Sequence, residues 1–146
     1  MSVGEYCNRE VVVIDKDSSV IDAARLMREY HVGDLVVINN GAMPIGILTD
    51  RDIVVELLAR DVAVNSVKIG DVMSFELYTA REGDSLGDTL KHMRSNGIRH
   101  IPVINRDEKL VGILTVDDVI DVITEQLDDV VALIGREQKR ERQGRQ

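Results

Sequence analysis

The stretch that decides the fold occurs twice, as IGILTDRDIV at residues 45–54 and as VGILTVDDVI at residues 111–120. With a shift of 66 residues, the copies share a Gly-Ile-Leu-Thr run, which begins at Gly46 and Gly112, and an Asp three residues after the Thr. In each copy a short apolar run ends at a Thr, acidic residues follow, and the apolar spacing then becomes helical. This order predicts a strand that turns directly into a helix.

The same register extends well beyond this stretch. It runs without a gap from Ser19 to Val54, and it pairs Val-Ile-Asn at 37–39 with Val-Ile-Asn at 103–105. A long period that occurs only twice indicates a duplicated supersecondary unit rather than an open solenoid. Each unit has roughly 60 residues, close to the lower limit of what folds alone. We therefore expect the two halves to pack face to face about a pseudo-twofold axis.

Each unit is expected to fold as strand, helix, strand, strand, helix. The expected strands are 10–14, 35–38 and 45–48 in the first unit and 76–80, 101–104 and 110–114 in the second. This is an α/β (α+β) fold of two β-α-β-β-α repeats packed sheet to sheet. We place the first repeat at 9–60, a linker at 61–75, the second repeat at 76–127, and a helical extension with a basic tail at 128–146.

The composition is that of a soluble globular protein, and it argues against several classes. The chain has 146 residues, 30% of them charged, and a net charge of −8. With one Phe and no Trp, it lacks the basic face and the stacking aromatics that nucleic-acid-binding proteins use. No apolar run approaches the ~20 residues of a membrane helix, and no secretion signal is visible. Because Cys7 is the single cysteine, we expect a reduced, cytoplasmic protein.

The last expected helix runs past the repeat unit. Its apolar residues step by 3, 4, 3 and 4, a spacing typical of a coiled-coil seam: Ile120, Ile123, Leu127, Val130 and Ile134. We interpret this seam as the contact of a homodimer; the alternative is a helix packed on its own domain. The tail at 136–146 carries a charge of +3, and it is either a solvated terminus or a contact for RNA or a partner.

The repeated Thr-x-x-Asp has two interpretations. Thr49 with Asp52, and Thr115 with Asp118, resemble capping boxes at the starts of helices. Three features favour a ligand site instead. The Asp side chain is short for a capping box. A Gly lies within each strand, where it weakens the strand unless another group approaches the backbone closely. The Thr-Asp pair also recurs at the same turn in both units. Free N–H groups at such a turn favour phosphate, and an Asp can hold a ribose diol.

These residues resemble the CBS domain, named for cystathionine beta-synthase. The resemblance rests on the order of elements, on the Gly-h-h-Thr-x-x-Asp ending present twice, and on the stretch HMRSNGIRHIPVINRDEKLVGILTVDDVI at 92–120. It covers nearly the whole chain and implies a tandem CBS pair, or Bateman module. In that family two clefts between the paired sheets bind adenosine-containing ligands such as AMP, ADP, ATP or S-adenosylmethionine.

The resemblance also implies roles for individual residues. The acids of the repeated motif would hold ribose hydroxyls, and its threonines would lie near the ribose or phosphate: Asp52, Asp118, Thr49 and Thr115. Backbone groups at two strand starts would face adenine: Val13 and Thr79. Arg99 and His100, just before Pro102, match positions where some members place basic residues against phosphate; the alternative is a surface pair at a strand entrance.

The first copy differs at these last positions. Gly33 and Asp34 stand where the second copy has its basic pair, and Val36 replaces the Pro. An Asp that faces phosphate is repulsive, and Arg51 could compensate for it. We predict that the cleft with the basic pair prefers the more phosphorylated ligand, while the other cleft takes a less charged ligand or stays empty.

Catalytic and metal-binding motifs are absent from the sequence. The three His have no metal-ligand spacing, and there is no HExxH, nucleophile elbow or P-loop. We therefore expect neither an enzyme nor a required cofactor. The leading hypothesis is a regulatory module that senses an adenine nucleotide and signals through a homodimer to a separate regulated protein. The alternatives are a structural or interaction CBS module without ligand binding, and an acid-base enzyme or a nucleic-acid binder that uses the tail.

Overall fold

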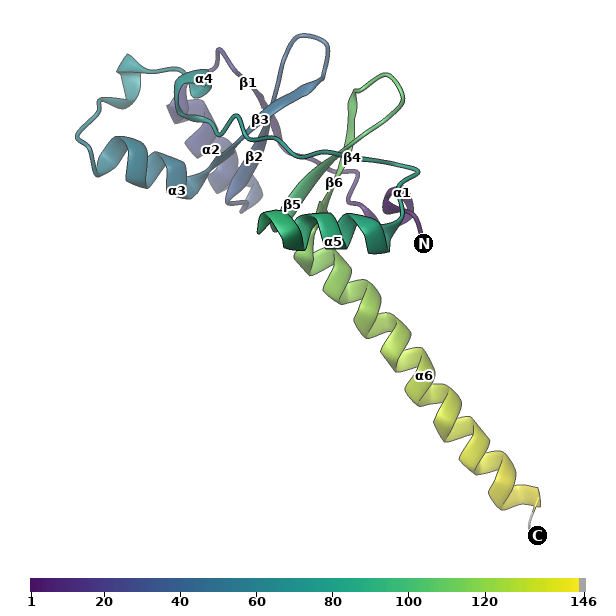
Figure 1. Ribbon diagram of the computed structural model, residues 1–146. Coiled ribbons are helices and arrows are strands. Elements are labelled where there is room, and N and C mark those ends of the chain that lie inside the picture. Colours follow the sequence, from purple (N-terminus) through teal and green to yellow (C-terminus); the bar gives the residue numbers. More distant parts are fainter. Residues whose placement is uncertain (145–146) are drawn as a thin grey trace.

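Two three-stranded sheets form the centre of the molecule (Figure 1). The computed structural model describes residues 1–144, so Arg145 and Gln146 of the expected basic tail lie outside the described residues. The strand orders are β1-β2-β3 and β4-β5-β6. In each sheet the first two strands are parallel and the last two form an antiparallel hairpin. The mixed α/β architecture of two β-α-β-β-α repeats is therefore confirmed.

The elements follow the expected order, with additions before and between the repeats. The strands are β1 (Val13–Asp15), β2 (Asp34–Ile38), β3 (Pro44–Thr49), β4 (Ala80–Arg81), β5 (His100–Ile104) and β6 (Leu110–Thr115). The helices are α1 (Val3–Tyr6), α2 (Val20–Tyr30), α3 (Asp50–Asp52), the π-helical η1 (Ile53–Leu58), the 3-10 turn η2 (Val64–Ser66), α4 (Ile69–Val72), α5 (Leu86–Asn96) and α6 (Val116–Gly144). The first strand of each sheet begins later than the expected 10–14 and 76–80.

The helices α2 and α5 begin and end at equivalent residues. Ser19 caps α2 by accepting a hydrogen bond of 3.0 Å from the N–H of Asp22, and Ser85 caps α5 in the same way. Both helices stop at a residue with left-handed backbone, His31 after α2 and Gly97 after α5. These starts and stops depend on local signals that the sequence itself contains.

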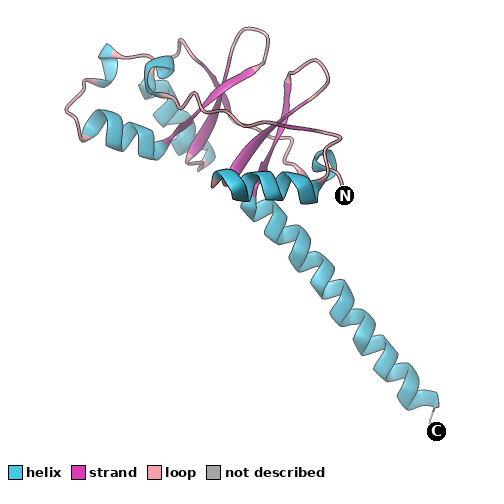
Figure 2. Cartoon of the chain, viewed as in Figure 1, coloured by secondary structure: helices cyan, strands magenta, loops and turns pink. Residues whose placement is uncertain are grey.

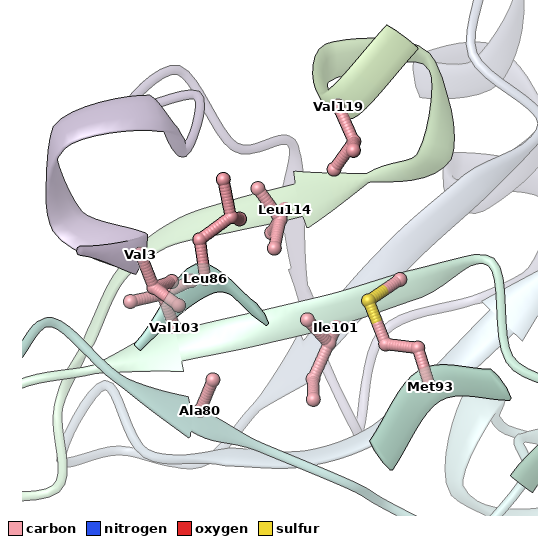
Figure 3. Packing of buried hydrophobic residues seen from close by; sticks show 8 residues of the cluster. All are labelled: Val3, Ala80, Leu86, Met93, Ile101, Val103, Leu114 and Val119. Carbon is pink, nitrogen blue, oxygen red and sulfur yellow. The ribbon is translucent and has the colours of Figure 1, made fainter. Parts of the chain in front are cut away.

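The segment before the first repeat packs on the second repeat. Val3 of α1 is fully buried in the core of the second repeat, where Figure 3 places it beside Leu86 and Val103. Farther along the segment, Asn8 pairs with Ile113 of β6 through two hydrogen bonds of 2.9 Å. The N-terminal segment therefore completes the core of the other half.

The stretch at 61–75 packs on the first repeat and completes its core. Ile69 of α4 is fully buried in the core of the first repeat. Ser74 pairs with Ile47 of β3 through hydrogen bonds of 2.9 and 3.3 Å. Because α1 and α4 are themselves 66 residues apart, the two halves exchange equivalent segments.

The two sheets meet through the faces that point away from their own helices. Val36 of β2 is 1% exposed yet belongs to neither core cluster, and Pro102 of β5 is buried in the same way. At the hairpin loops, the N–H of Leu110 donates to the carbonyl of Ala42 at 3.0 Å, and the two loops lie side by side in Figure 1. These contacts give the sheet-to-sheet packing that the sequence predicts.

The last helix, α6, leaves the body of the protein (Figures 1 and 2). Within it only Val119 is buried. The seam residues are 49–60% exposed: Ile120, Ile123, Leu127, Val130 and Ile134. The seam therefore does not pack on its own domain. No helix within residues 1–144 is both long enough and apolar enough to span a bilayer.

Candidate ligand-binding cleft

Each Thr-x-x-Asp turn closes a capping box. Thr49 Oγ1 accepts a hydrogen bond of 3.1 Å from the N–H of Asp52, and Asp52 Oδ2 accepts one of 2.9 Å from the N–H of Thr49. In the second turn the N–H of Asp118 donates to Thr115 Oγ1 at 3.2 Å, and the N–H of Thr115 donates to Asp118 Oδ2 at 3.1 Å. The expectation that Asp is too short for this box is wrong, because the strand runs directly into the helix and brings the Thr N–H within its reach.

The strand glycines are required by the crossing segments. A Cβ on Gly46 would lie 2.7 Å from the Met73 sulfur and 2.7 Å from the carbonyl oxygen of the next residue. A Cβ on Gly112 would lie 2.7 Å from the Cys7 sulfur and 2.9 Å from the next carbonyl oxygen. The group that approaches each glycine closely is a crossing segment of this chain, so the glycines are not evidence for a ligand.

A cleft opens between the two repeats beside the second turn. Its two lobes share five lining residues: Asn8, Glu10, Val11, Val12 and Val32. The larger lobe, of about 580 Å³, adds three residues of the first repeat: Val13, Leu26 and Tyr30. The smaller lobe, of about 220 Å³, adds residues of both repeats: Asp34, Val36, His100, Ile113, Thr115 and Asp117. Cavities of a few hundred Å³ hold small organic ligands.

Carboxylates dominate the polar lining of this cleft. Glu10, Asp34 and Asp117 line it, and His100 is the one basic side chain among its lining residues in the described part of the chain. His100 Nε2 lies 3.9 Å from Asp34 Oδ1. The two residues hold equivalent positions in the repeats, so they meet near the pseudo-twofold axis. This charge balance suits a ligand with little negative charge.

Several of the residues singled out from the sequence come together here. Val13 lines the larger lobe, and His100 and Thr115 line the smaller one. Asp118 is not among the lining residues, but it is half-buried and its carboxylate is hydrogen-bonded to Thr115, which lines the smaller lobe. Arg99 is exposed, and its carbonyl accepts a hydrogen bond of 3.0 Å from the first N–H of α6. Pro102 is buried in the contact between the sheets rather than at the cleft wall.

The residues assigned to the other cleft are more dispersed. Thr79 lines a hollow of about 190 Å³ next to α5, whereas Asp52 lines a separate hollow of about 400 Å³ next to η1. Thr49 is half-buried in its capping box, and Arg51 is exposed. The expected division, with Asp34 at one cleft and His100 at the other, also differs from the structure, since both line the same cleft.

Sequence reasoning missed the contribution of the N-terminal segment to the cleft. Asn8 and Glu10 line both lobes, but neither is among the site residues expected from the sequence. A signal was present, because Gly4 matches Gly70 and Glu10 matches Glu76 in the same register.

Two groups on this segment have shifted pKa values. Burial raises the pKa of the Cys7 thiol, and the nearby Arg9 offsets part of that shift. A hydrogen bond of 2.6 Å to Glu82 raises the pKa of the Arg9 guanidinium and ties the segment to the second repeat. Within residues 1–144, no group of three or more His, Cys, Asp or Glu side chains is placed to hold a metal ion.

Comparison with known proteins gives consistent matches over the body of the chain. The family model of the CBS domain matches twice, at residues 3–59 and 69–125. An uncharacterized protein of Methanopyrus kandleri is 33% identical over 122 residues, which make up 84% of this chain and 62% of that protein. The present chain therefore spans less than two thirds of that relative.

Two solved structures with more than a quarter of their residues identical have the same fold. Hypoxic Response Protein I, solved with two coordinated zinc ions, has a TM-score of 0.75 and 29% identity, covering 83% of this chain and 98% of its own. CBSX2, solved in complex with AMP, has a TM-score of 0.74 and 26% identity, covering 85% of this chain and 96% of its own.

Proposed function

Because this chain belongs to the CBS-domain family and carries the domain as a tandem pair, we propose that it is a regulatory module that binds an adenosine-containing ligand in the cleft between its repeats. One observation carries the proposal: an apolar strip of the first repeat and the capped turn of the second line one cleft of suitable size. The complex of the similar CBSX2 with AMP supports the choice of ligand class.

The cleft offers distinct surfaces to the parts of such a ligand. Val12, Val13 and Leu26 form an apolar wall for the adenine ring. Asp118 makes its capping bonds through Oδ2, so Oδ1 is the oxygen that would accept a ribose hydroxyl. The capping box also holds the carboxylate in place before the ligand arrives, which lowers the entropy cost of binding. Asp118 would then both cap the helix and bind the ligand.

The charges of the lining favour the less phosphorylated candidates. Glu10, Asp34 and Asp117 would repel a triphosphate, and His100 alone faces them. We therefore rank AMP and S-adenosylmethionine above ADP and ATP for this cleft. This ranking replaces the expectation that His100 marks the cleft for the most phosphorylated ligand.

We further propose that occupancy of the cleft is signalled through a homodimer to a separate, unidentified regulated protein. Membership of the family supports this role. A structural or interaction module without ligand binding is the alternative, and ligand titration distinguishes the two.

Thermal unfolding with AMP, ADP, ATP, S-adenosylmethionine and adenosine tests the ligand class. A ligand at 100 times its Kd raises the free energy of unfolding by about 2.7 kcal/mol, which corresponds to several degrees in Tm for a chain of this size. The absence of a shift with every adenosine compound would refute the sensor and favour the structural module.

A pair of variants then tests the site. Asp118→Asn keeps a side-chain oxygen for the cap but removes the carboxylate, and we expect it to weaken binding by about tenfold or more, as for loss of a hydrogen bond to a charged group. Asp121→Asn removes an exposed carboxylate from the next turn of α6, and it should bind as the wild type does. Equal affinity in the Asp118 variant contradicts the ribose role.

A further inference from the structure

The helix α6 combines an uncovered apolar stripe with a divided charge. Two more exposed apolar residues flank its seam, Val131 at 60% and Leu133 at 61%. Residues 117–129 contain six acidic and no basic side chains: Asp117, Asp118, Asp121, Glu125, Asp128 and Asp129. Residues 136–142 contain four basic side chains and two acidic ones. The helix is therefore negative next to the body and positive toward its far end.

We propose that this stripe binds a second copy of the same chain, with the two α6 helices antiparallel. A parallel pair would set six carboxylates of one helix beside the same six of the other, which is repulsive. An antiparallel pair sets the acidic half of each helix beside the basic end of its partner, and a twofold axis makes both contacts identical. The charge pattern of α6 is thus complementary to its own reversed copy.

The seam fixes the register of this pair. In antiparallel coiled coils, residues that step by three and four meet across the interface in layers. The best alignment sets Ile123 against Ile134 of the second copy and Leu127 against Val130, twice each by symmetry. Beyond Ile134 the seam positions are Glu137 and Glu141, so the apolar contact ends there.

The same register brings the opposite charges level with each other. Residues 136–142 of one helix, with four basic side chains, lie level with residues 115–121 of the other, which include Asp117, Asp118 and Asp121. The ten residues that follow Ile134 within α6 are then long enough to reach back to the start of the partner helix. This inference rests on the homodimer of the proposed function but not on the ligand, so a monomeric chain would refute the dimer and leave the thermal test of ligand binding unaffected.

Sedimentation equilibrium of the full chain tests the contact. The wild type should be a dimer, and Leu127→Asp should raise the dimer Kd by roughly 100-fold or more, because each dimer loses two buried leucines. Since Leu127 is 60% exposed in the single chain, the variant should fold normally, with unchanged circular dichroism in the body. Glu125→Gln, on the opposite face of α6, is the matched control and should dimerise as the wild type does. A monomeric wild type, or a dimer indifferent to Leu127→Asp, overturns the proposal.

Salt tests the orientation. Raising NaCl from 0.1 to 1 M shortens the screening length from about 10 to 3 Å, so an antiparallel pair should weaken by several-fold. A parallel pair should instead tighten, because its repulsion is screened, and that result would overturn the antiparallel arrangement.

Spin labels measure the orientation directly. The test uses a Cys7→Ser background with a spin label at Arg142→Cys. In the antiparallel register, position 142 lies level with residue 115 of the second copy. The two labels are then 27 residues apart along the axis, or roughly 40 Å at 1.5 Å per residue. In a parallel pair the same labels lie at one level on helices about 10 Å apart. A label at Ala132→Cys, near the centre of the pairing, should report a short distance in both arrangements and controls for labelling. A short distance at position 142 refutes the proposal.

Discussion

Replacing Gly112 by Ala should damage the fold at the point where the N-terminal segment crosses the second sheet. The new Cβ would lie 2.7 Å from the Cys7 sulfur and 2.9 Å from the carbonyl oxygen of Asn8. The sulfur belongs to a side chain and can rotate away. The carbonyl oxygen cannot move easily, because Asn8 exchanges two hydrogen bonds of 2.9 Å with Ile113.

The size of the effect follows from these two contacts. Overpacking of a well-packed site costs about 1–3 kcal/mol. If the segment moves back instead, the two hydrogen bonds of Asn8 weaken, and each contributes about 1 kcal/mol. By either route we expect a loss of about 1–3 kcal/mol in the free energy of unfolding, and a fall in Tm of several degrees for a chain of this size.

Urea unfolding followed by circular dichroism measures this loss. Gly83→Ala is the control, because a Cβ at Gly83 meets nothing within 4 Å, and its effect should stay within about 0.5 kcal/mol. Adding Cys7→Ala to Gly112→Ala should restore part of the stability but not all, since the backbone oxygen remains. If Gly112→Ala were as stable as the wild type, the crossing of the segment over β6 would be wrong.

Two further predictions concern the caps and the thiol. Thr49→Ala and Thr115→Ala should each cost about 1 kcal/mol of unfolding free energy, since each removes an N-cap acceptor; urea titration measures this, and Thr124→Ala on the exposed part of α6 should cost nothing. Because burial raises the pKa of Cys7, the folded chain should react more slowly with Ellman's reagent at pH 8 than the urea-unfolded chain, and equal rates would contradict its burial. The raised pKa means that the neutral thiol stabilises the fold fully below the ordinary cysteine pKa of about 8.5, and that this stabilisation is lost as the pH rises through the folded value. Cys7→Ser should lack this alkaline loss.

The sequence predicts those parts of the fold that depend on neighbouring residues. Ser19 caps the start of α2, Ser85 caps the start of α5, and Gly97 ends α5. Such caps depend on residues only three or four positions apart. The hairpins follow from apolar runs joined by turn residues. The repeated Gly-Ile-Leu-Thr motif reveals the duplication, and the duplication predicts an architecture of two repeats.

The exchange of segments between the halves could not be predicted in this way. Each exchanged helix, α1 or α4, has four residues, which is too short for a periodic apolar pattern. The contact between Asn8 and Ile113 joins residues far apart in the chain, and no local signal specifies it. For the same reason the glycines at 46 and 112 were attributed to a ligand, when the chain itself makes the close approach.

The cleft was predicted in part, and the reason lies in symmetry. The residue-by-residue correspondence of the repeats predicts separate clefts for Asp34 and His100. In a pseudo-twofold pair, equivalent residues close to the axis meet each other, and these two lie 3.9 Å apart in one cleft. Comparison of the copies identifies Asp34 and His100 as equivalent positions but does not predict that they share one cleft.

This meeting at the axis also makes the cleft asymmetric. Two identical acids at the axis would repel each other, whereas the divergence to Asp34 and His100 removes that repulsion. With side chains that are 20% and 41% exposed, such a pair contributes at most about 1 kcal/mol to stability. Its larger effect is on the lining of the cleft, where His100 lies among three carboxylates: Glu10, Asp34 and Asp117. For the proposed ligand site, we therefore predict that a change at one axial residue alters ligand preference more than it alters the stability of the fold.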